Sequence, residues 1–408
     1  MAAKIAAAPK PGWHGIDFTE RDTDRDQDPF PALHHLREVA PVNLTPIGIW
    51  RLSRYADCVR LLRDTPCGVR RSDGTAVGTS MGGNDGGGQF MLQQDPPAHT
   101  RLRKLVSKAF TPRASERWRP RTRQIVAELL EPALAAGELD AIAGLALPVP
   151  STIICEMLGV PTADRGRFTT WTSDATHLLA GDLLEPEQRA KSEASIGEFA
   201  LYFQALLEDR RKHLGDDLLS VLIRAEEAGD RLSPDELLVQ SMGLLVAGFE
   251  TTIGLIGLGV KNLVANPDEL AKLRERPALV ESAVEECLRY EGPIGATTRV
   301  LHADAEFGGY VIPKDTVVWP MLWAANHDPE RFPDPDRFDI ARDATGHLAF
   351  GGGTHLCLGA HLARMEAQEA IGALASRTRK LAREEKPIEW GRSLFRVPAR
   401  LDLTLEAA

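Results

Sequence analysis

The chain has 408 residues, of which 43% are hydrophobic and 26% are charged, so it is long enough to bury a large core as a globular protein. Its formal net charge of −10 argues against a general nucleic-acid-binding protein, because nucleic acids select basic surfaces. The five cysteines include no Cys-x-x-Cys pair, which argues against a disulfide framework and for a reducing compartment.

Residues 1–15 are predicted to form a disordered tail. The alanine-rich run at the start is too short for a signal peptide and is interrupted by Pro9. No Pro- or Ser-rich linker divides the rest of the chain, so we expect a single domain over residues 1–408. We also expect a cytoplasmic protein without a membrane anchor.

The first predicted elements are a short helix over residues 29–40, a small hairpin over residues 41–55 and a helix over residues 58–63. Residues 68–88 contain eight glycines and show no periodicity. This segment is therefore predicted to be either a mobile loop or a disordered surface insertion.

A helix is predicted to begin near Pro97, and it places His99 and Arg103 on one face, four residues apart. Both side chains can therefore reach a single anionic group, although such a pair is also common on a solvated basic face. Basic residues continue along the chain at Lys104, Lys108, Arg113, Arg117 and Arg119. This run is either a solvated charged surface or a docking patch for an acidic partner protein.

Helical patterns continue through the middle of the chain, over residues 121–136, 142–159, 164–180 and 185–213. Ser233 and Glu236 then form a capping-box signature, and the helix that they open is expected to run to Asn266, a length of about 50 Å. Its centre is apolar enough for a membrane span, but the capped start and the polar pair Glu250 and Thr251 argue against one.

The centre of this long helix is also a candidate for chemistry. Gly248 leaves room for a ligand against the backbone, while Glu250 and Thr251 place an acid and a hydroxyl together in an apolar setting. Buried polar groups need a partner or a function. The segment is therefore either a helix packed through threonine–backbone bonds or part of an active site.

The last third of the chain is predicted to contain a helix over residues 281–290, a strand-rich portion over residues 310–323 and a final strand over residues 399–405. The helix carries Glu286 and Arg289 on one face, at a spacing that suits an ion pair. On a solvent-exposed face such a pair contributes only about 0.3–0.5 kcal/mol.

The glycine-rich stretch 350–360 places Cys357 directly before a predicted helix. Backbone N–H groups of such a loop and of the helix N-terminus stabilise a thiolate, so Cys357 is a candidate metal ligand. The surrounding glycines would let a flat, bulky group lie close above the sulfur, and His355 is a candidate donor to a nearby anion. The alternative is a free core cysteine beside a glycine turn.

The stretch from Phe350 to Gly359 matches every fixed position of the heme-binding loop of the cytochrome P-450 superfamily: Phe, Gly or Ser, any, Gly, any, His or Arg, any, Cys, any, Gly. The chain therefore resembles a soluble bacterial member of that superfamily. The resemblance implies a mainly α protein with a single cytochrome P-450 fold, a long central helix and small β-sheets. It also implies heme b (iron protoporphyrin IX) as the cofactor, with Cys357 as the iron ligand.

The resemblance assigns heme contacts to His99, Arg103, Arg299, His355, Phe350, Gly351 and Gly359, and the four basic residues among them are candidates for the propionates. Glu250 and Thr251 are expected to form a proton relay. In it Thr251 holds the bound oxygen and its water, and Glu250 passes protons inward from solvent. Thr252 is the alternative hydroxyl.

The resemblance also implies a substrate pocket lined by Phe90, Met91, Leu244, Ala247, Gly248, Ile294, Ala296, Thr297, Leu394 and Phe395. The loop at 68–88 and a lid over 168–203 are expected to cover this pocket. Glu286, Arg289 and Arg337 are expected to form a buried structural triad.

The function that these motifs imply is a monooxygenase that hydroxylates or epoxidises a lipophilic small molecule. Its two electrons would come from NAD(P)H through a reductase and a ferredoxin-type partner. Two alternatives use the same Cys357: a peroxide-driven peroxygenase or isomerase, and a non-catalytic heme-thiolate sensor or ligand carrier. We expect a monomer that binds neither nucleic acid nor membrane.

Overall fold

The structure is a computed structural model that describes residues 27–77, 90–178, 185–227, 232–384, 386–391 and 395–408. The chain forms two compact units, the first from residues 1–77 and 285–357 and the second from residues 78–284 and 358–408. Several expectations concern residues outside the described ones, namely the tail at 1–15, the part of the 68–88 loop from residue 78 on, the part of the 168–203 lid at 179–184, and Leu394. The expectation of a single domain stays a prediction.

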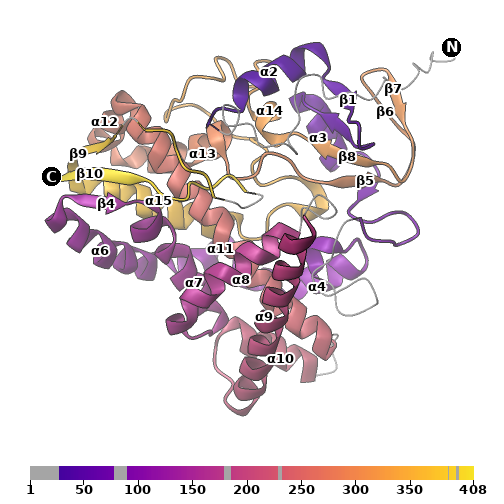
Figure 1. Cartoon of the computed structure of the whole chain (residues 1–408), viewed down its shortest axis with the longest axis horizontal. Coiled ribbons are helices and arrows are strands. Elements are labelled where there is room, and N and C mark those ends of the chain that lie inside the picture. The colour runs from indigo at the N-terminus through magenta and orange to yellow at the C-terminus, as the bar shows by residue number, and fades with distance from the viewer. Residues whose placement is uncertain (1–26, 78–89, 179–184, 228–231, 385, 392–394) are drawn as a thin grey trace. The chain divides into compact units, whose positions relative to one another are not determined.

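The second unit is mainly helical (Figure 1). Its longest helix, α11 (Pro234–Ala265), packs against α7 (Pro148–Leu158), α8 (Arg165–Leu178), α9 (Pro186–Lys212) and α15 (Ala360–Arg377). The other helices of this unit are α4 (Ala98–Val106), α5 (Pro112–Glu116), α6 (Arg119–Ala136), α10 (Leu218–Glu227) and α12 (Pro267–Glu275), with a π-helical turn at Ile142–Ala146. The predicted helices are confirmed, and α10 and α12 are additions that the sequence patterns did not indicate.

Helix α11 begins as predicted. The Ser233 hydroxyl accepts a hydrogen bond from the Glu236 backbone N–H at 3.1 Å, and the Glu236 carboxylate accepts one from the Ser233 N–H at 3.0 Å. The helix has 32 residues, which gives a length of about 48 Å. By length and mean hydropathy (1.7) it is able to cross a membrane, but 83% of the apolar window is buried inside the protein. It is therefore a core helix.

A small antiparallel sheet completes the second unit. Strand β10 (Asp402–Ala407) lies between β4 (Glu138–Asp140) and β9 (Thr378–Arg383), as Figure 1 shows. Because β10 pairs with both neighbours, the C-terminal segment is tied to the ends of α6 and α15. The predicted final strand is thus confirmed, shifted by about three residues.

The first unit combines short helices with a mixed sheet. Its helices are α2 (Phe30–Val39), α3 (Tyr55–Arg63) and α14 (Leu322–Asn326), together with the part of α13 (Val280–Glu291) that follows residue 284. Its strands are β1 (Val42–Leu44), β2 (Trp50–Leu52), β3 (Cys67–Gly68), β5 (Arg299–Leu301) and β8 (Val317–Pro320), paired in the order β1-β2-β8-β5-β3, and the separate hairpin β6 (Ala305–Phe307) and β7 (Tyr310–Ile312). The predicted N-terminal helix and hairpin are confirmed.

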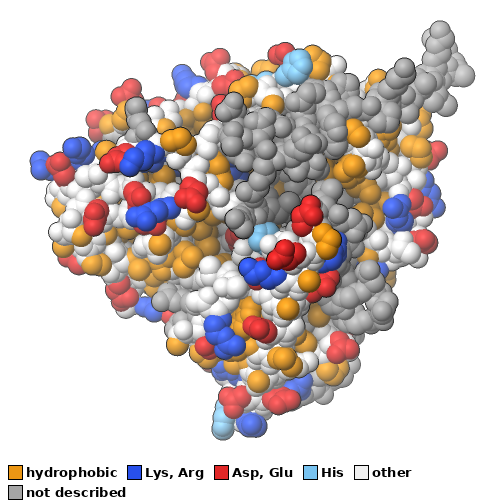
Figure 2. Space-filling model, viewed as in Figure 1, with side chains coloured by type: hydrophobic (Ala, Val, Ile, Leu, Met, Phe, Trp, Pro, Cys, Tyr) orange, Lys and Arg blue, Asp and Glu red, His pale blue; other side chains and the backbone are white. Residues whose placement is uncertain are grey.

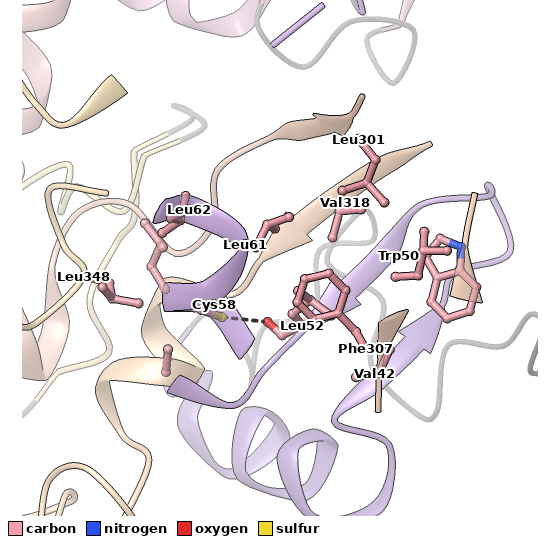
Figure 3. Close-up of a cluster of buried hydrophobic side chains, with 13 residues drawn as sticks. Val42, Trp50, Leu52, Cys58, Leu61, Leu62, Leu301, Phe307, Val318 and Leu348 are labelled. Atoms are coloured by element: carbon pink, nitrogen blue, oxygen red, sulfur yellow. Dashed lines mark hydrogen bonds between the residues drawn. The ribbon is translucent and has the colours of Figure 1, made fainter. Parts of the chain in front are cut away.

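The apolar core of this unit lies between the sheet and α3 (Figure 3). Trp50 and Leu52 from β2 pack in the same cluster as Leu61 and Leu62 from α3. Cys58 donates its S–H to the Leu52 carbonyl at 3.2 Å, and burial raises the pKa of this thiol. Cys58 is therefore a packing residue and not a reactive thiol.

The glycine-rich segment after residue 67 is more ordered at its start than predicted. Gly68 belongs to β3, which pairs with β5, and an isolated bridge joins Arg70 and Ala76. The Asp315 carboxylate accepts hydrogen bonds from the Ser72 N–H at 2.6 Å and from the Ser72 hydroxyl at 2.8 Å. The anchoring residue Asp315 belongs to a turn 243 residues away, so local sequence patterns do not predict this contact.

Candidate active site

The cysteine loop lies in the first unit, and two of its glycines hold backbone conformations that other residues rarely adopt. Gly351 has φ +70° and Gly353 has φ +66°. A Cβ atom on Gly353 would lie 2.0 Å from the Leu62 carbonyl oxygen, so the loop passes directly over the end of α3. The Cys357 N–H donates to the Phe350 carbonyl at 3.0 Å and closes the loop. Cys357 itself is exposed.

Arg299 lies beside this loop. It begins β5, is 5% exposed, and donates to the Thr298 carbonyl at 2.7 Å and to the Gly352 carbonyl at 3.4 Å. Its guanidinium therefore brings a buried positive charge to the backbone of the loop that carries Cys357. Such a cation is stable where an anion accompanies it. His355 is partly buried in the same loop.

The segment that leads into β5 carries three predicted pocket residues. Ile294, Ala296 and Thr297 are all partly exposed. Ala296 forms a bridge to Met321, and the Thr297 hydroxyl lies 3.4 Å from an Arg299 nitrogen. These three residues, Arg299 and the cysteine loop therefore belong to one compact unit.

Two of the three predicted members of the triad, Glu286 and Arg289, are found in it. Glu286 and Arg289 are fully buried and form a two-point ion pair at 2.7 and 2.8 Å. The third arginine is Arg342, whose Nε lies 3.3 Å from Glu286 Oε1. Arg337 is wrong for this role, because its side chain is 67% exposed and pairs with Asp339.

A tight turn explains why Arg342 and not Arg337 contacts Glu286. Asp334 has φ +49°, and the Arg337 N–H donates to its carbonyl at 3.1 Å, which directs Arg337 outward. Arg342 donates to the carbonyls of Pro333, Asp334 and Arg337, so its side chain closes the turn while it reaches Glu286. The Asp339 N–H adds a further bond to Glu286 at 3.0 Å. Arg342 is therefore a structural residue that the sequence reasoning missed.

In the second unit, α11 is buried along its middle except at one place. In the fully described stretch 239–260, every residue is buried except Ala247, Gly248 and Thr251. These positions follow one another at i, i+1 and i+4, so they form one accessible patch on one face of the helix. Three of the predicted catalytic and pocket residues thus lie together.

The two threonines of α11 differ in access. The Thr251 hydroxyl donates to the Ala247 carbonyl at 3.0 Å and lies on the accessible patch. Thr252 is 4% exposed and its hydroxyl is 3.4 Å from the Gly248 carbonyl. Because the Thr251 hydroxyl donates its hydrogen to a backbone carbonyl of the helix, its oxygen lone pairs remain available to accept a hydrogen bond from a ligand or water.

On α11, Glu250 faces helix α8. It is 9% exposed, and its Oε2 accepts a hydrogen bond from the Thr176 hydroxyl of α8 at 2.9 Å. A cavity of about 160 Å³ lies beside it, lined in part by Thr169, Thr172 and Ser173. That volume is enough for several water molecules. Thr176 and this mostly apolar cavity were not predicted, since α8 lies more than seventy residues away in sequence.

The remaining predicted residues of the second unit surround the start of α11. Phe90 is 5% exposed and packs so closely on Gly243 that a Cβ there would lie 2.3 Å from its ring. The Met91 N–H donates to the Gln240 side chain at 3.0 Å, and Leu244 is 4% exposed. These contacts fix the segment at residues 90–93 against α11. Phe395 is partly exposed at the edge of the described C-terminal segment.

Helix α4 holds the predicted basic pair. His99 is 2% exposed and Arg103 is partly exposed, one turn further along the same face. Of the basic run that follows, four residues are exposed, namely Lys104, Lys108, Arg113 and Arg117. Arg119 pairs with Glu116 and Glu369, so it belongs to a structural ion-pair network.

Figure 2 shows acidic and basic side chains interspersed over one face of the molecule. The net charge of −10 is not gathered into a single acidic patch on that face.

Comparison with known proteins gives a consistent result. The family model for cytochrome P450 matches residues 69–379. The 6-deoxyerythronolide B hydroxylase of Saccharopolyspora erythraea is 45% identical, with 92% of this chain and 96% of the relative covered. Cytochrome P450 monooxygenase PikC of Streptomyces venezuelae is 42% identical, with 92% and 89% covered. Among solved structures, CalO2 has a TM-score of 0.86 and 35% identity, with 96% of this chain and 98% of CalO2 covered. The chain therefore belongs to the cytochrome P450 family, as a heme-containing oxidoreductase of the bacterial monooxygenase type.

Proposed function

We propose that this enzyme inserts one oxygen atom of O2 into a lipophilic small molecule, by hydroxylation or epoxidation. The two electrons come from NAD(P)H through a reductase and a ferredoxin-type partner, and the protein acts as a cytoplasmic monomer. The observation that carries the proposal is the accessible patch at Ala247, Gly248 and Thr251 on the otherwise buried α11, with the acid Glu250 directly beside it. A binding protein needs no such pair.

The described residues fit heme b as the cofactor. Cys357 is an exposed thiol at the end of a loop that two left-handed glycines shape, so a flat ring can approach its sulfur. Arg299 supplies a buried cation next to that loop, which suits a propionate. Cys357 is the proposed iron ligand, and the proposed contacts of the ring and its propionates are His99, Arg103, Arg299, His355, Phe350, Gly351 and Gly359. When bound, the heme supplies the activation of O2.

The reaction also needs protons, and residues of the chain have to deliver them. The Thr251 hydroxyl, whose hydrogen is directed to Ala247, accepts a hydrogen bond from water or from a protonated oxygen at the patch. The Glu250 carboxylate faces a cavity with hydroxyl groups and is oriented by Thr176. A rotation of the Glu250 side chain toward Thr251 would carry a proton from this cavity to the patch. Thr252, the alternative hydroxyl, is 4% exposed and lies outside the patch, so we assign the role to Thr251.

The substrate is proposed to be lipophilic because the pocket candidates in both units are largely apolar. Phe90, Met91, Leu244, Ile294 and Phe395 are examples. The relatives' names include hydroxylases of 6-deoxyerythronolide B and vitamin D(3), and related structures contain myristic acid or testosterone. A screen with macrolactones, sterols and fatty acids therefore covers the relevant shapes.

The first test is the absorption spectrum of the dithionite-reduced protein under carbon monoxide. We expect a strongly red-shifted Soret band in the wild type and its loss in Cys357→Ser, because a thiolate pushes electron density onto the iron. Cys155→Ser, which removes a buried thiol of the second unit, is the control and should keep the band. A band typical of histidine-ligated heme in the wild type contradicts the assignment.

The relay is tested by coupling. In Thr251→Ala, NADPH should be consumed with hydrogen peroxide released instead of product, while heme binding is retained. Thr252→Ala is the matched control, since its hydroxyl is buried on the same turn of helix. Unchanged coupling in Thr251→Ala would refute the relay.

Two experiments separate the alternatives. A peroxygenase forms product in a single turnover with peroxide as efficiently as with the reductase system, whereas the proposed enzyme needs the electron supply. A sensor or ligand carrier changes its spectrum with ligand but consumes no NADPH.

A further inference from the structure

Three side chains of the first unit, none of which belongs to the cysteine loop, lie close together. They are His34 from α2, His327 from the C-terminal end of α14, and Asp336 from the turn that follows. His34 Nε2 lies 3.1 Å from Asp336 Oδ1, and His327 Nδ1 lies 2.9 Å from the same oxygen. All three potential ligand atoms lie within 4.8 Å of one another. Nothing in the proposed monooxygenase reaction uses them.

The hydrogen bonding of His327 defines which of its nitrogens faces the cluster. Its Nε2 lies 2.7 Å from the Tyr290 carbonyl oxygen. A carbonyl can only accept, so Nε2 carries a proton and donates it, which leaves Nδ1 to face Asp336. A histidine that donates one N–H to a backbone carbonyl and directs its other nitrogen to a carboxylate oxygen has the arrangement of a metal ligand.

The ring of His327 is also held in place. It is 1% exposed and stacks on Phe30 with ring centroids 4.2 Å apart. His34 is less constrained, with 23% of its side chain exposed, and its Nε2 forms no hydrogen bond to any residue that the structure describes, despite the short distance to Asp336. Its nitrogen is thus near the carboxylate but not aligned with it.

The distances suit a transition-metal ion. With metal–ligand bonds of about 2.0–2.1 Å, neighbouring ligand atoms are about 2.9 Å apart in octahedral geometry and about 3.4 Å apart in tetrahedral geometry. The two nitrogen–oxygen distances of 2.9 and 3.1 Å are close to the octahedral value and shorter than the tetrahedral one, and the two imidazole nitrogens lie within 4.8 Å of each other. The Asp336 side chain is 63% exposed, so an ion can enter from solvent and keep water as a further ligand.

The neighbouring charges do not exclude a cation. Arg37, on the same helix as His34, donates to the Ala324 carbonyl at 2.8 Å. Asp328, Asp336 and Glu38 all stabilise its charge electrostatically. The surroundings therefore hold three carboxylates for one guanidinium.

We propose that His34, His327 and Asp336 form a binding site for one divalent transition-metal ion, with Zn2+ as the reference ion. Two imidazole nitrogens and one carboxylate oxygen are a ligand set that zinc accepts, with water molecules in the remaining coordination positions, whereas Mg2+ and Ca2+ prefer oxygen ligands. The ion would connect α2 to the segment that follows α14, two regions almost three hundred residues apart in sequence. It therefore stabilises the first unit without taking part in oxygen chemistry.

The test uses the heme-loaded full-length protein after treatment with a chelator. Zn2+ is titrated calorimetrically, and bound zinc is counted by mass spectrometry after gel filtration. We expect one strong site per chain and a higher unfolding midpoint with Zn2+ but not with Mg2+. His34→Ala should weaken this site at least about tenfold, because one of three protein ligands is lost.

His35→Ala is the matched control, since it removes the exposed neighbouring imidazole on the same helix. It should bind zinc as the wild type does. Asp336→Asn provides a second variant at an exposed position and should also weaken binding. Equal zinc affinity in the wild type, His34→Ala and Asp336→Asn overturns the proposal, as does the absence of stoichiometric binding to the wild type.

Discussion

Replacing Arg342 by alanine should destabilise the protein far more than replacing Arg337. Arg342 is 11% exposed on its side chain and contacts the carboxylate of Glu286, which is completely buried. It also donates to three backbone carbonyls of the preceding turn. Its removal therefore takes one cation from a buried ion network and leaves backbone acceptors without their donor.

The magnitude follows from these contacts. A hydrogen bond to a charged group contributes roughly 1.5–3 kcal/mol, and Glu286 keeps its bonds to Arg289 and Asp339 after the substitution. We expect Arg342→Ala to lower the free energy of unfolding by about 3 kcal/mol. Arg337 forms an exposed pair with Asp339, for which less than about 1 kcal/mol is expected.

The assay is urea unfolding of the heme-loaded protein, followed by far-UV circular dichroism and by the Soret band. A double-mutant cycle with Glu286→Gln isolates the interaction of Arg342 with the carboxylate. If Arg337→Ala lowers the unfolding midpoint as much as Arg342→Ala, or if the cycle shows no coupling to Glu286, then the reasoning about the buried triad is wrong.

Three further predictions concern other parts of the chain. Burial raises the pKa of Glu366 on α15 to about 8 from 4.5, so the folded state favours the protonated acid, and the free energy of unfolding falls as the pH rises between these values. In urea titrations, Glu366→Gln should therefore be more stable than the wild type by about 3 kcal/mol at pH 7 and equal to it below pH 4.5. A stability difference that does not change with pH contradicts this prediction. Gly353→Ala should lower the heme content and the thermal midpoint more than Gly351→Ala, because both residues have positive φ but only the first would clash with a backbone oxygen. Charge reversal at the exposed Lys104 and Arg113 should raise the Michaelis constant for ferredoxin, most strongly at low salt. If the change does not depend on salt, the basic run is a solvated surface and not a docking patch.

Local signals in the sequence predicted the elements well. The capping box at Ser233 and Glu236 specifies the start of α11 because each partner lies within one helical turn of the other. The glycine pattern around Cys357 likewise depends on neighbours within a few residues. Helices α10 and α12 were missed because they are short and follow other helices closely, so no separate pattern marked them.

Interactions between distant segments were harder to predict. The sequence pattern indicates Arg337 for the triad and not Arg342, because spacing alone cannot show how a turn that contains an aspartate with positive φ directs each side chain. Thr176 was missed for a similar reason, since its role depends on the packing of α8 against α11.

The same limit explains why a resemblance to a known family locates some functions and not others. A motif such as the cysteine loop is contiguous, so the sequence contains the whole of it. His34, His327 and Asp336 are each unremarkable in sequence, and only the packing of α2 on α14 brings their ligand atoms together. Glu250 shows both cases: its place beside Thr251 is a local fact, whereas its bond to Thr176 and the cavity beside it depend on the fold. Residues that act through long-range convergence are therefore where the structure adds most to the sequence, and the zinc titration and the Arg342 cycle test two such sets directly.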